Sequence, residues 1–358
     1  MIRIGIVGIG FMGMIHYLAA RKLKGAQVTA ICSRDPKKLA GDWRSIRGNF
    51  GPPGEMMDLG SIKKYDRPEK LLADPDIDLI DICNPTHLHP ATALQALNAG
   101  KHVLVEKCIA LETRDADAMV DAAAKAGKLL MVAHVLPFFA EFAYAADVIR
   151  SRRFGKLLGA HFKRVISRPD WSAEIADAAK TGGPAIDLHI HDTHFIGLVC
   201  GVPPAVFSTG VLEQGAVQYL TTQYLYGSGG PPHPSPSPPG GEGGVRGPCV
   251  TCSSGALAMP ARPFVHGYEI YLEQATLVYE SGSMPLTVLH ADGRTEQPKF
   301  ESGDDATAAF TSELQAAVDG VVNKRLPDLL SGKLARDALV LCHRECESVR
   351  TGKPVSVK

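Results

Sequence analysis

Apolar and polar positions alternate in a way that predicts strands and helices in turn through the first 130 residues. Strands are predicted at 2–10, 27–33, 78–84 and 101–107, with another after Lys128, and helices at 11–23, 89–100 and 114–127. Two of these helices end in glycine followed by lysine, a typical helix stop. Strands alternating with helices at this spacing predict an α/β fold with a parallel, doubly wound sheet.

The pattern changes after about residue 133. Stretches of period two dominate the second part and predict a larger antiparallel or mixed sheet; they lie at 157–167, 205–214, 216–226 and 267–280. Helices are predicted at 139–151, 306–322 and 333–350. We therefore expect two domains, a dinucleotide-binding domain at 1–133 and an α/β domain at 134–358.

One segment of the second part differs in composition from the rest. Residues 227–248 read GSGGPPHPSPSPPGGEGGVRGP and are mostly glycine and proline. Such a segment has almost no apolar side chains to bury and few main-chain donors for a regular ladder. We interpret it as a disordered insertion between two strands.

Charge and cysteine content narrow the possible partners and the compartment. Lys and Arg total 38, as do Asp and Glu, so bulk charge favours neither nucleic acid nor an acidic membrane as a partner. No apolar run is long enough to span a bilayer, and the N-terminal strand leaves no room for a signal peptide. We expect a cytoplasmic protein with reduced thiols, Cys249 and Cys252 among them.

The glycines at the end of the first strand indicate a nucleotide site. GIGFMG gives Gly8, Gly10 and Gly13 in a G-x-G-x-x-G pattern between a strand and a helix, with Phe11 and Met12 inside it. This context predicts that the helix N-terminus binds the pyrophosphate of a dinucleotide.

The second strand ends in ICSRDPKK, where an acidic residue would bind both ribose hydroxyls. Ser33 and Arg34 occupy the tip instead, with Lys38 nearby, and these residues suit a 2′-phosphate. The sequence therefore favours NADP, with NAD as the alternative in which Asp35 takes the acid's place.

The chain resembles the Gfo/Idh/MocA oxidoreductases nearly from end to end. The resemblance rests on GIGFMGMIH (8–16), LLADPDIDLIDICNPTHLH (71–89), ALNAGKHVLVEK (96–107), GGPAIDLHIHDTHFIGLVCG (182–201) and RTGKPVSV (350–357). It implies a Rossmann domain followed by an α/β domain with a large open, mostly antiparallel sheet. It also implies a homodimer or homotetramer that oxidises or reduces a secondary alcohol of a sugar, cyclitol or glycoside with NAD(P).

The resemblance also implies roles for particular residues. Glu106 and Lys107 match the first two residues of the family's Glu-Lys-Pro motif, in which the lysine contacts the substrate hydroxyl beside the nicotinamide; Cys108 takes the third place. Asp187 and His191 match the family's Asp-x-x-x-His motif. Further cofactor contacts are expected from Asn84, Pro85, Thr86, His87, His89, Glu106 and Lys107. Further substrate contacts are expected from His134, Trp171 and His194.

The segment DLHIHDTH (187–194) is the densest group of candidate residues. Pro184 suits the first turn of a helix and Gly201 the position past its end, so one helix is predicted, with 187, 191 and 194 on one face. A histidine near neutral pKa can take the alcohol proton, and an ammonium at Lys107 can stabilise the oxyanion. Zinc at this face is the alternative; we expect no metal, because hydride transfer needs none.

Two further functions remain open at this point. One is a redox-neutral, NAD-dependent glycosidase, which would use the same residues. The other is a cofactor-binding sensor without catalysis, which the presence of Lys107, Asp187 and His191 argues against.

Overall fold

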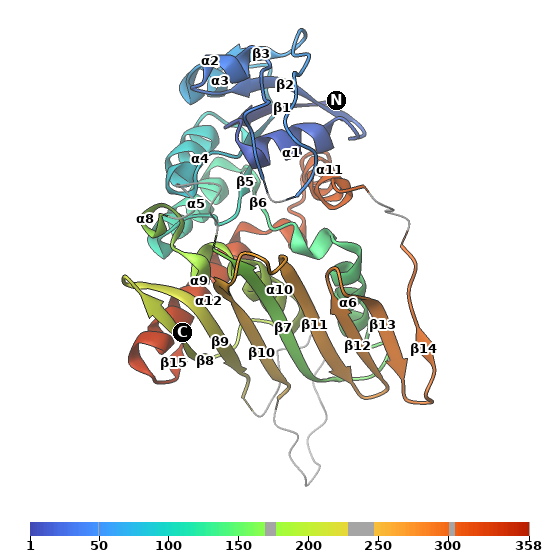
Figure 1. Cartoon of the computed structure of the whole chain (residues 1–358). Helices are drawn as coiled ribbons and strands as arrows, with labels where there is room; N and C mark the ends of the chain where they lie inside the picture. Colours follow the sequence, from blue (N-terminus) through green and yellow to red (C-terminus); the bar gives the residue numbers. More distant parts are fainter. Residues whose placement is uncertain (49, 169–176, 228–246, 301–304, 358) are drawn as a thin grey trace. The chain divides into compact units, whose positions relative to one another are not determined.

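The protein is represented by a computed structural model that describes residues 1–48, 50–168, 177–227, 247–300 and 305–357 (Figure 1). The chain forms two compact units, one of Met1–Phe139 with Ser302–Leu339 and one of Ala140–Glu301 with Val340–Lys358. This differs from the single boundary predicted near residue 133, because the chain returns to the first unit after the second sheet. Periodicity along the chain carries no information about such a return.

The first unit contains a parallel sheet of six strands among the described residues. Its order is β3-β2-β1-β4-β5-β6, and every neighbouring pair is parallel. The strands are β1 (Ile2–Val7), β2 (Ala26–Cys32), β3 (Lys63–Tyr65), β4 (Leu79–Ile82), β5 (His102–Glu106) and β6 (Leu130–Ala133). This is the doubly wound sheet that the sequence predicts.

Helices cover this sheet and contribute to its core. They are α1 (Phe11–Ala20), α2 (Pro36–Leu39), α3 (Pro68–Leu72), α4 (His89–Asn98), α5 (Thr113–Ala126), α11 (Ala308–Asn323) and the start of α12 (Gly332–Thr351), with short 3-10 turns η1 (Thr86–Leu88), η2 (Leu136–Phe138) and η3 (Asp328–Leu330). Helices α1 and α11 pack together, as do α4 and α5. Apolar residues of α11 such as Phe310 and Leu314 join Ile4, Ile6 and Ile15 in one buried cluster, which explains why the returning helix belongs here.

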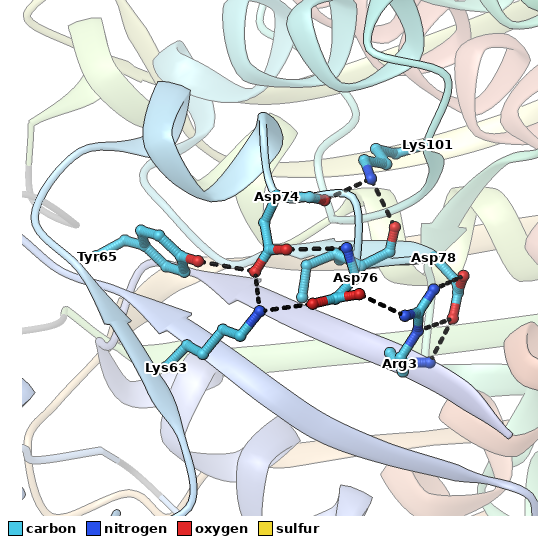
Figure 2. Close-up of polar contacts among 8 residues, drawn as sticks. Arg3, Lys63, Tyr65, Asp74, Asp76, Asp78 and Lys101 are labelled. Carbon is cyan, nitrogen blue, oxygen red and sulfur yellow. Dashed lines mark hydrogen bonds and ion pairs between the residues drawn. The ribbon is translucent and has the colours of Figure 1, made fainter.

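The amino-terminal ends of the strands are joined by a network of charges (Figure 2). The Asp74 carboxylate accepts from Lys63 Nζ at 2.8 Å and from the Tyr65 hydroxyl at 2.7 Å, and Lys101 Nζ donates to the Asp74 carbonyl at 2.7 Å. Burial disfavours the charged Asp74 carboxyl, but these donors and the Asp76 amide outweigh it and lower its pKa to about 2. The loop before β4 is therefore fixed to β3 and to the start of β5.

The second unit contains a sheet of nine strands within the described ranges, in the order β14-β13-β12-β11-β7-β10-β9-β8-β15. Only β7 and β10 pair in parallel among the pairs that it forms. The strands are β7 (Leu157–Ser167), β8 (Ala205–Glu213), β9 (Ala216–Leu225), β10 (Cys249–Ala258), β11 (Val265–Leu272), β12 (Ala275–Glu280), β13 (Met284–His290), β14 (Thr295–Glu296) and β15 (Val355–Ser356).

Helices α6 (Ala140–Ser151), α8 (Ala178–Thr181), α9 (Pro184–Asp187) and α10 (Ile190–Cys200) belong to the second unit, and α10 packs on β7. Burial alternates along β11, where Ile270 and Leu272 are buried and Glu269 and Tyr271 are exposed. This strand therefore has one covered face and one open face.

The period-two stretch at 267–280 contains two strands. β11 and β12 are antiparallel and are joined at Glu273 and Gln274. Period two continues across a two-residue turn, so alternation alone does not reveal the reversal. The predicted disordered insertion falls largely on 228–246, outside the described residues.

Within the described ranges, no helix combines the length and the apolar character that crossing a bilayer requires.

Replacing Asp74 with Asn should destabilise the protein by about 1–3 kcal/mol at pH 7, since the replacement removes charge-assisted hydrogen bonds from a buried site. The pKa of Asp74 is depressed in the folded state, so its contribution is present above the unfolded pKa of about 4 and is lost as the pH falls towards 2. Urea unfolding of wild type and Asp74→Asn at pH 7 and pH 3 measures both effects.

Asp76→Asn is the matched control, because Asp76 pairs with Lys63 and Arg3 but its side chain is 60% exposed, compared with 5% for Asp74. Exposed pairs contribute little. Equal losses from the two substitutions would contradict this account.

Candidate functional site

The parallel sheet of the first unit brings most of the predicted cofactor residues to one edge. Gly8 follows β1, Ser33 follows β2, Asn84 lies just beyond β4, and Lys107 follows β5. All these strands are parallel, so their carboxyl ends lie at the same edge of the sheet, where α/β proteins bind ligands. The charge network of Figure 2 lies at the opposite edge.

The glycine turn after β1 has the geometry of a phosphate cradle. Gly8 has φ +100°, and a Cβ on Gly13 would lie 2.0 Å from the Gly8 carbonyl oxygen, so both positions require glycine. A Cβ on Gly10 would meet no heavy atom within 4 Å, so packing does not require glycine there. Gly10 occupies the N-cap of α1, where the described residues provide no side-chain cap, so amides of the first turn are available to an anion.

The tip of β2 presents a cation. Arg34 is exposed, whereas the Ser33 hydroxyl accepts from the Asp35 amide at 3.2 Å. The Asp35 carboxylate caps α2 by accepting from the Lys37 amide at 2.9 Å. One oxygen of that carboxylate is thus used within the protein. Lys38 is half-buried beside this tip.

A buried histidine contacts the loop after β4. His89 is 1% exposed, and its ring nitrogens lie 2.7 Å from the Cys108 carbonyl oxygen and 2.8 Å from that of Asn84. The ring therefore ties this loop to the one after β5. Of the other predicted contacts here, Pro85 and Thr86 are half-buried and His87 is exposed.

Contacts of the neighbouring Glu106 fix the main chain of Lys107. The Glu106 carboxylate accepts from the Lys107 amide at 3.0 Å, and its other oxygen lies 3.0 Å from Nε2 of His16 in α1. Nδ1 of the same imidazole lies 3.0 Å from Asp81 in β4. His16 is fully buried and Lys107 is half-buried.

The segment 187–194 is right-handed throughout but is not one uninterrupted helix. Helix α9 ends at Asp187 and α10 begins at Ile190. The His189 amide donates to the Pro184 carbonyl, five residues back. The hydrogen bond here therefore spans five residues instead of the four of a regular α-helix. The prediction of a regular helix was therefore wrong at 188–189.

Two buried polar contacts fix this interrupted segment within the second unit. Arg164 of β7 holds Asp192 through two contacts, at 2.7 and 3.1 Å. His189 lies 2.8 Å from Glu345 of α12, and neither side chain is exposed to solvent. His189 and Asp192 thus face inward.

The predicted substrate residues of the second unit differ in their exposure to solvent. Asp187 and His191 are half-buried, whereas His194 is fully buried and burial lowers its pKa to about 3. A common accessible face for all three is therefore not present. In the first unit, His134 follows β6 and is also fully buried. Trp171 lies outside the described residues.

A metal site at 187–194 has no support in the geometry. Within the part of the chain that the structure describes, only His16, Asp81 and Cys83 bring three ligand atoms within 4.8 Å of one another. Burial raises the pKa of the Cys83 thiol, which disfavours the thiolate that a metal needs. Both ring nitrogens of His16 already face carboxylates.

The interpretation of the sequence missed His16, Asp81 and Glu313, all of which are buried in the first unit. The available signal was a charged residue within an apolar stretch, such as Asp81 in the β4 run DLIDIC. Buried charges are generally paired, so each one predicts a partner, although not its identity.

Comparisons with known proteins agree with this fold. The chain is 26% identical to 1,5-anhydro-D-fructose reductase of Ensifer adhaerens over 87% of its own length and 88% of the relative's. It is 27% identical to myo-inositol 2-dehydrogenase of Thermotoga maritima over 56% of its length, and the match spans only 55% of that relative. Its fold matches scyllo-inositol dehydrogenase of Lactobacillus casei, solved with NAD(H) and scyllo-inositol, with a TM-score of 0.72, 21% identity and 99% of each chain covered.

The sequence model of one family matches the first unit directly. It is the Gfo/Idh/MocA family, described as an oxidoreductase family with an NAD-binding Rossmann fold, and the match covers residues 2–134. The glycine turn, the strand order and the Glu106–Lys107 strand end all lie within this range. Residues 2–134 therefore match the NAD-binding Rossmann domain of the Gfo/Idh/MocA oxidoreductases.

Proposed function

We propose that the protein is an NAD(P)-dependent oxidoreductase that transfers hydride between the nicotinamide and a secondary alcohol or ketone of a sugar or cyclitol. The observation that carries this proposal is the glycine turn at Gly8–Gly13, with open space over Gly10 and an uncapped helix behind it. Lys107 lies at the end of β5, in the same sheet. The names of the relatives in the preceding comparison support the substrate class.

The first unit supplies the residues that would hold the cofactor. Amides at the start of α1 bind the pyrophosphate, and the chain at Gly10 allows its close approach. The exposed Arg34 binds a 2′-phosphate, which makes NADP the preferred cofactor. The bound nicotinamide supplies the hydride acceptor or donor.

The proton of the alcohol is the second requirement of the reaction. We assign the transfer of this proton to Lys107 and His191. The Lys107 ammonium stabilises the alkoxide oxygen, and the His191 imidazole exchanges the proton. Asp187, three positions before the start of α10, orients that imidazole or binds another hydroxyl. The half-exposure of all three side chains is compatible with contact to a soluble substrate.

The oligomeric state is a further part of the proposal. We propose a homodimer or homotetramer, supported by the exposed face of β11 and by exposed apolar residues such as Leu158 and Leu289. Exposed apolar patches commonly mark protein interfaces.

Gly10→Val should weaken NADPH binding at least about tenfold while leaving the melting temperature nearly unchanged. The Cβ of the added side chain would meet no heavy atom of the described residues within 4 Å, and the side chain would enter the space proposed for the pyrophosphate. Fluorescence titration and thermal unfolding measure the two effects. Gly13→Ala is the contrasting variant, since its Cβ would clash with the Gly8 carbonyl and should lower stability. NADPH affinity unaltered by Gly10→Val would exclude this cradle.

Arg34→Ala should weaken NADPH binding roughly tenfold or more and NADH binding little, because only NADPH offers the phosphate for a charge-assisted hydrogen bond. Arg21→Ala, at the other end of α1, is the matched exposed control. Calorimetric titration of both cofactors decides the preference. Tighter binding of NADH by wild type would replace NADP with NAD and leave the reaction class intact.

Lys107→Met and His191→Asn should each lower kcat by about 10²–10⁴-fold, the usual contribution of a general acid or base. NADPH affinity should fall much less than kcat, because the glycine turn holds the pyrophosphate and neither residue belongs to it. The assay follows cofactor absorbance with myo-inositol, scyllo-inositol and 1,5-anhydro-D-fructose, and Lys125→Met on the exposed face of α5 is the control.

A parallel measurement with nitrophenyl glycosides separates the alternatives. Release of nitrophenol without net cofactor reduction would identify the redox-neutral glycosidase. Cofactor binding without turnover of any sugar, cyclitol or glycoside would point to the sensor.

A further inference from the structure

A buried charge cluster links the helix of the glycine turn to the strand end that carries Lys107. It consists of His16 in α1, Asp81 in β4 and Glu106 at the end of β5. All three side chains are at most 9% exposed, and His16 lies between the two carboxylates at 3.0 Å from each. Three elements that are separated along the chain therefore meet at one imidazole.

The imidazole carries charge in this setting. Burial alone would lower the pKa of His16, but the Asp81 carboxylate outweighs it and raises the pKa well above the usual value. Cys83 adds a contact at 3.5 Å from Nδ1. A charged ring has an N–H on each side, which suits the carboxylates that face both nitrogens.

A fourth group limits the negative charge of this cluster. Glu313 of α11 is fully buried, and burial raises its pKa well above the usual range, with Glu106 and Asp81 adding to the effect. Its carboxyl oxygens have no hydrogen-bond partner among the described residues. Glu313 is therefore uncharged, and His16 supplies positive charge between Asp81 and Glu106.

Glu106 transmits this arrangement to Lys107. One carboxylate oxygen of Glu106 faces His16, and the other accepts the Lys107 amide at 3.0 Å. Rotation of the Glu106 side chain would break both contacts together. The direction in which the chain leaves β5 thus depends on a residue three positions after Gly13.

We propose that His16 is a positioning residue for Lys107, acting through the Glu106 carboxylate and anchored by Asp81. This inference rests on the proposed function, in which Lys107 contacts the substrate. It assigns His16 no contact with substrate or cofactor. The cluster couples the helix that binds the pyrophosphate to the lysine that stabilises the alkoxide, so the two are held in one rigid frame.

A double-mutant cycle tests this chain of contacts with the full-length protein. His16→Gln and Glu106→Gln should each lower kcat for the polyol turned over in the panel above by at least tenfold, up to about the 10²-fold that small misplacements cost. The substrate KM and the NADPH dissociation constant should stay within about twofold. The kcat of the double variant should be no more than about twofold lower than that of the less active single variant, because both substitutions disrupt the same interaction.

His102→Gln is the matched control, because His102 is a half-buried histidine at the other end of β5 that accepts the Leu129 amide. It should retain wild-type kcat. Multiplicative losses in the double variant, wild-type kcat in His16→Gln, or a loss confined to cofactor affinity would each overturn the proposal. Stoichiometric zinc that is lost in His16→Gln would also overturn it in favour of a metal site.

His16→Gln leaves two buried carboxylates without their cation and could unfold the protein. Glu106→Gln then carries the test, because its amide oxygen still accepts from Lys107 while the ion pair with His16 is lost. A tenfold or larger fall in kcat supports the proposal, and unchanged kcat contradicts it.

Nitrogen NMR of the histidine rings provides a readout that needs no substrate. One ring should keep both nitrogens protonated at pH 8 in wild type and lose this state in Asp81→Asn. A neutral His16 at pH 8 would contradict the charge cluster. Absence of turnover on every polyol with this signal intact would instead contradict the proposed function.

Discussion

The close contact between Gly8 and Gly13 sets the geometry on which the rest of the first unit depends. With no Cβ at either position, α1 begins directly beyond β1, and its first turn stays uncapped at the carboxyl edge of the sheet. The same placement puts His16 one turn further along, in the core between β4 and β5. A bulkier residue at position 13 would displace the helix, and with it both the anion cradle and the contact to Glu106.

Buried contacts with carboxylates recur beside the functional candidates. In the first unit, His16 holds Glu106 beside Lys107. In the second, Arg164 and Glu345 hold Asp192 and His189 on either side of His191. Burying such charges is costly unless they are paired with good geometry, so each pair strongly specifies one arrangement. The half-buried Lys107 and His191 are thereby flanked by residues with little freedom to move.

Local sequence patterns predicted the parallel sheet, the glycine turn and most element boundaries, because these features follow from periodicity and from residues with special backbone preferences. The strand at 157–167 and the helix ending before Gly127 are examples. Features that depend on distant partners were not predictable in this way. The prediction that 187, 191 and 194 share one face assumed a regular helix. The segment instead follows the contacts of Asp192 with Arg164 and of His189 with Glu345. His194 is consequently buried. The return of α11 to the first core has the same cause, because it depends on contacts of Phe310 with residues near the N-terminus.

The central claim is that the dinucleotide and Lys107 meet at the carboxyl edge of the six-stranded sheet. A crystal structure of the protein with NADP⁺ tests this claim most directly. The account predicts the pyrophosphate against the first-turn amides of α1 and over Gly10, with the nicotinamide ring beside Lys107. A cofactor bound elsewhere, or a nicotinamide directed away from the end of β5, would contradict it.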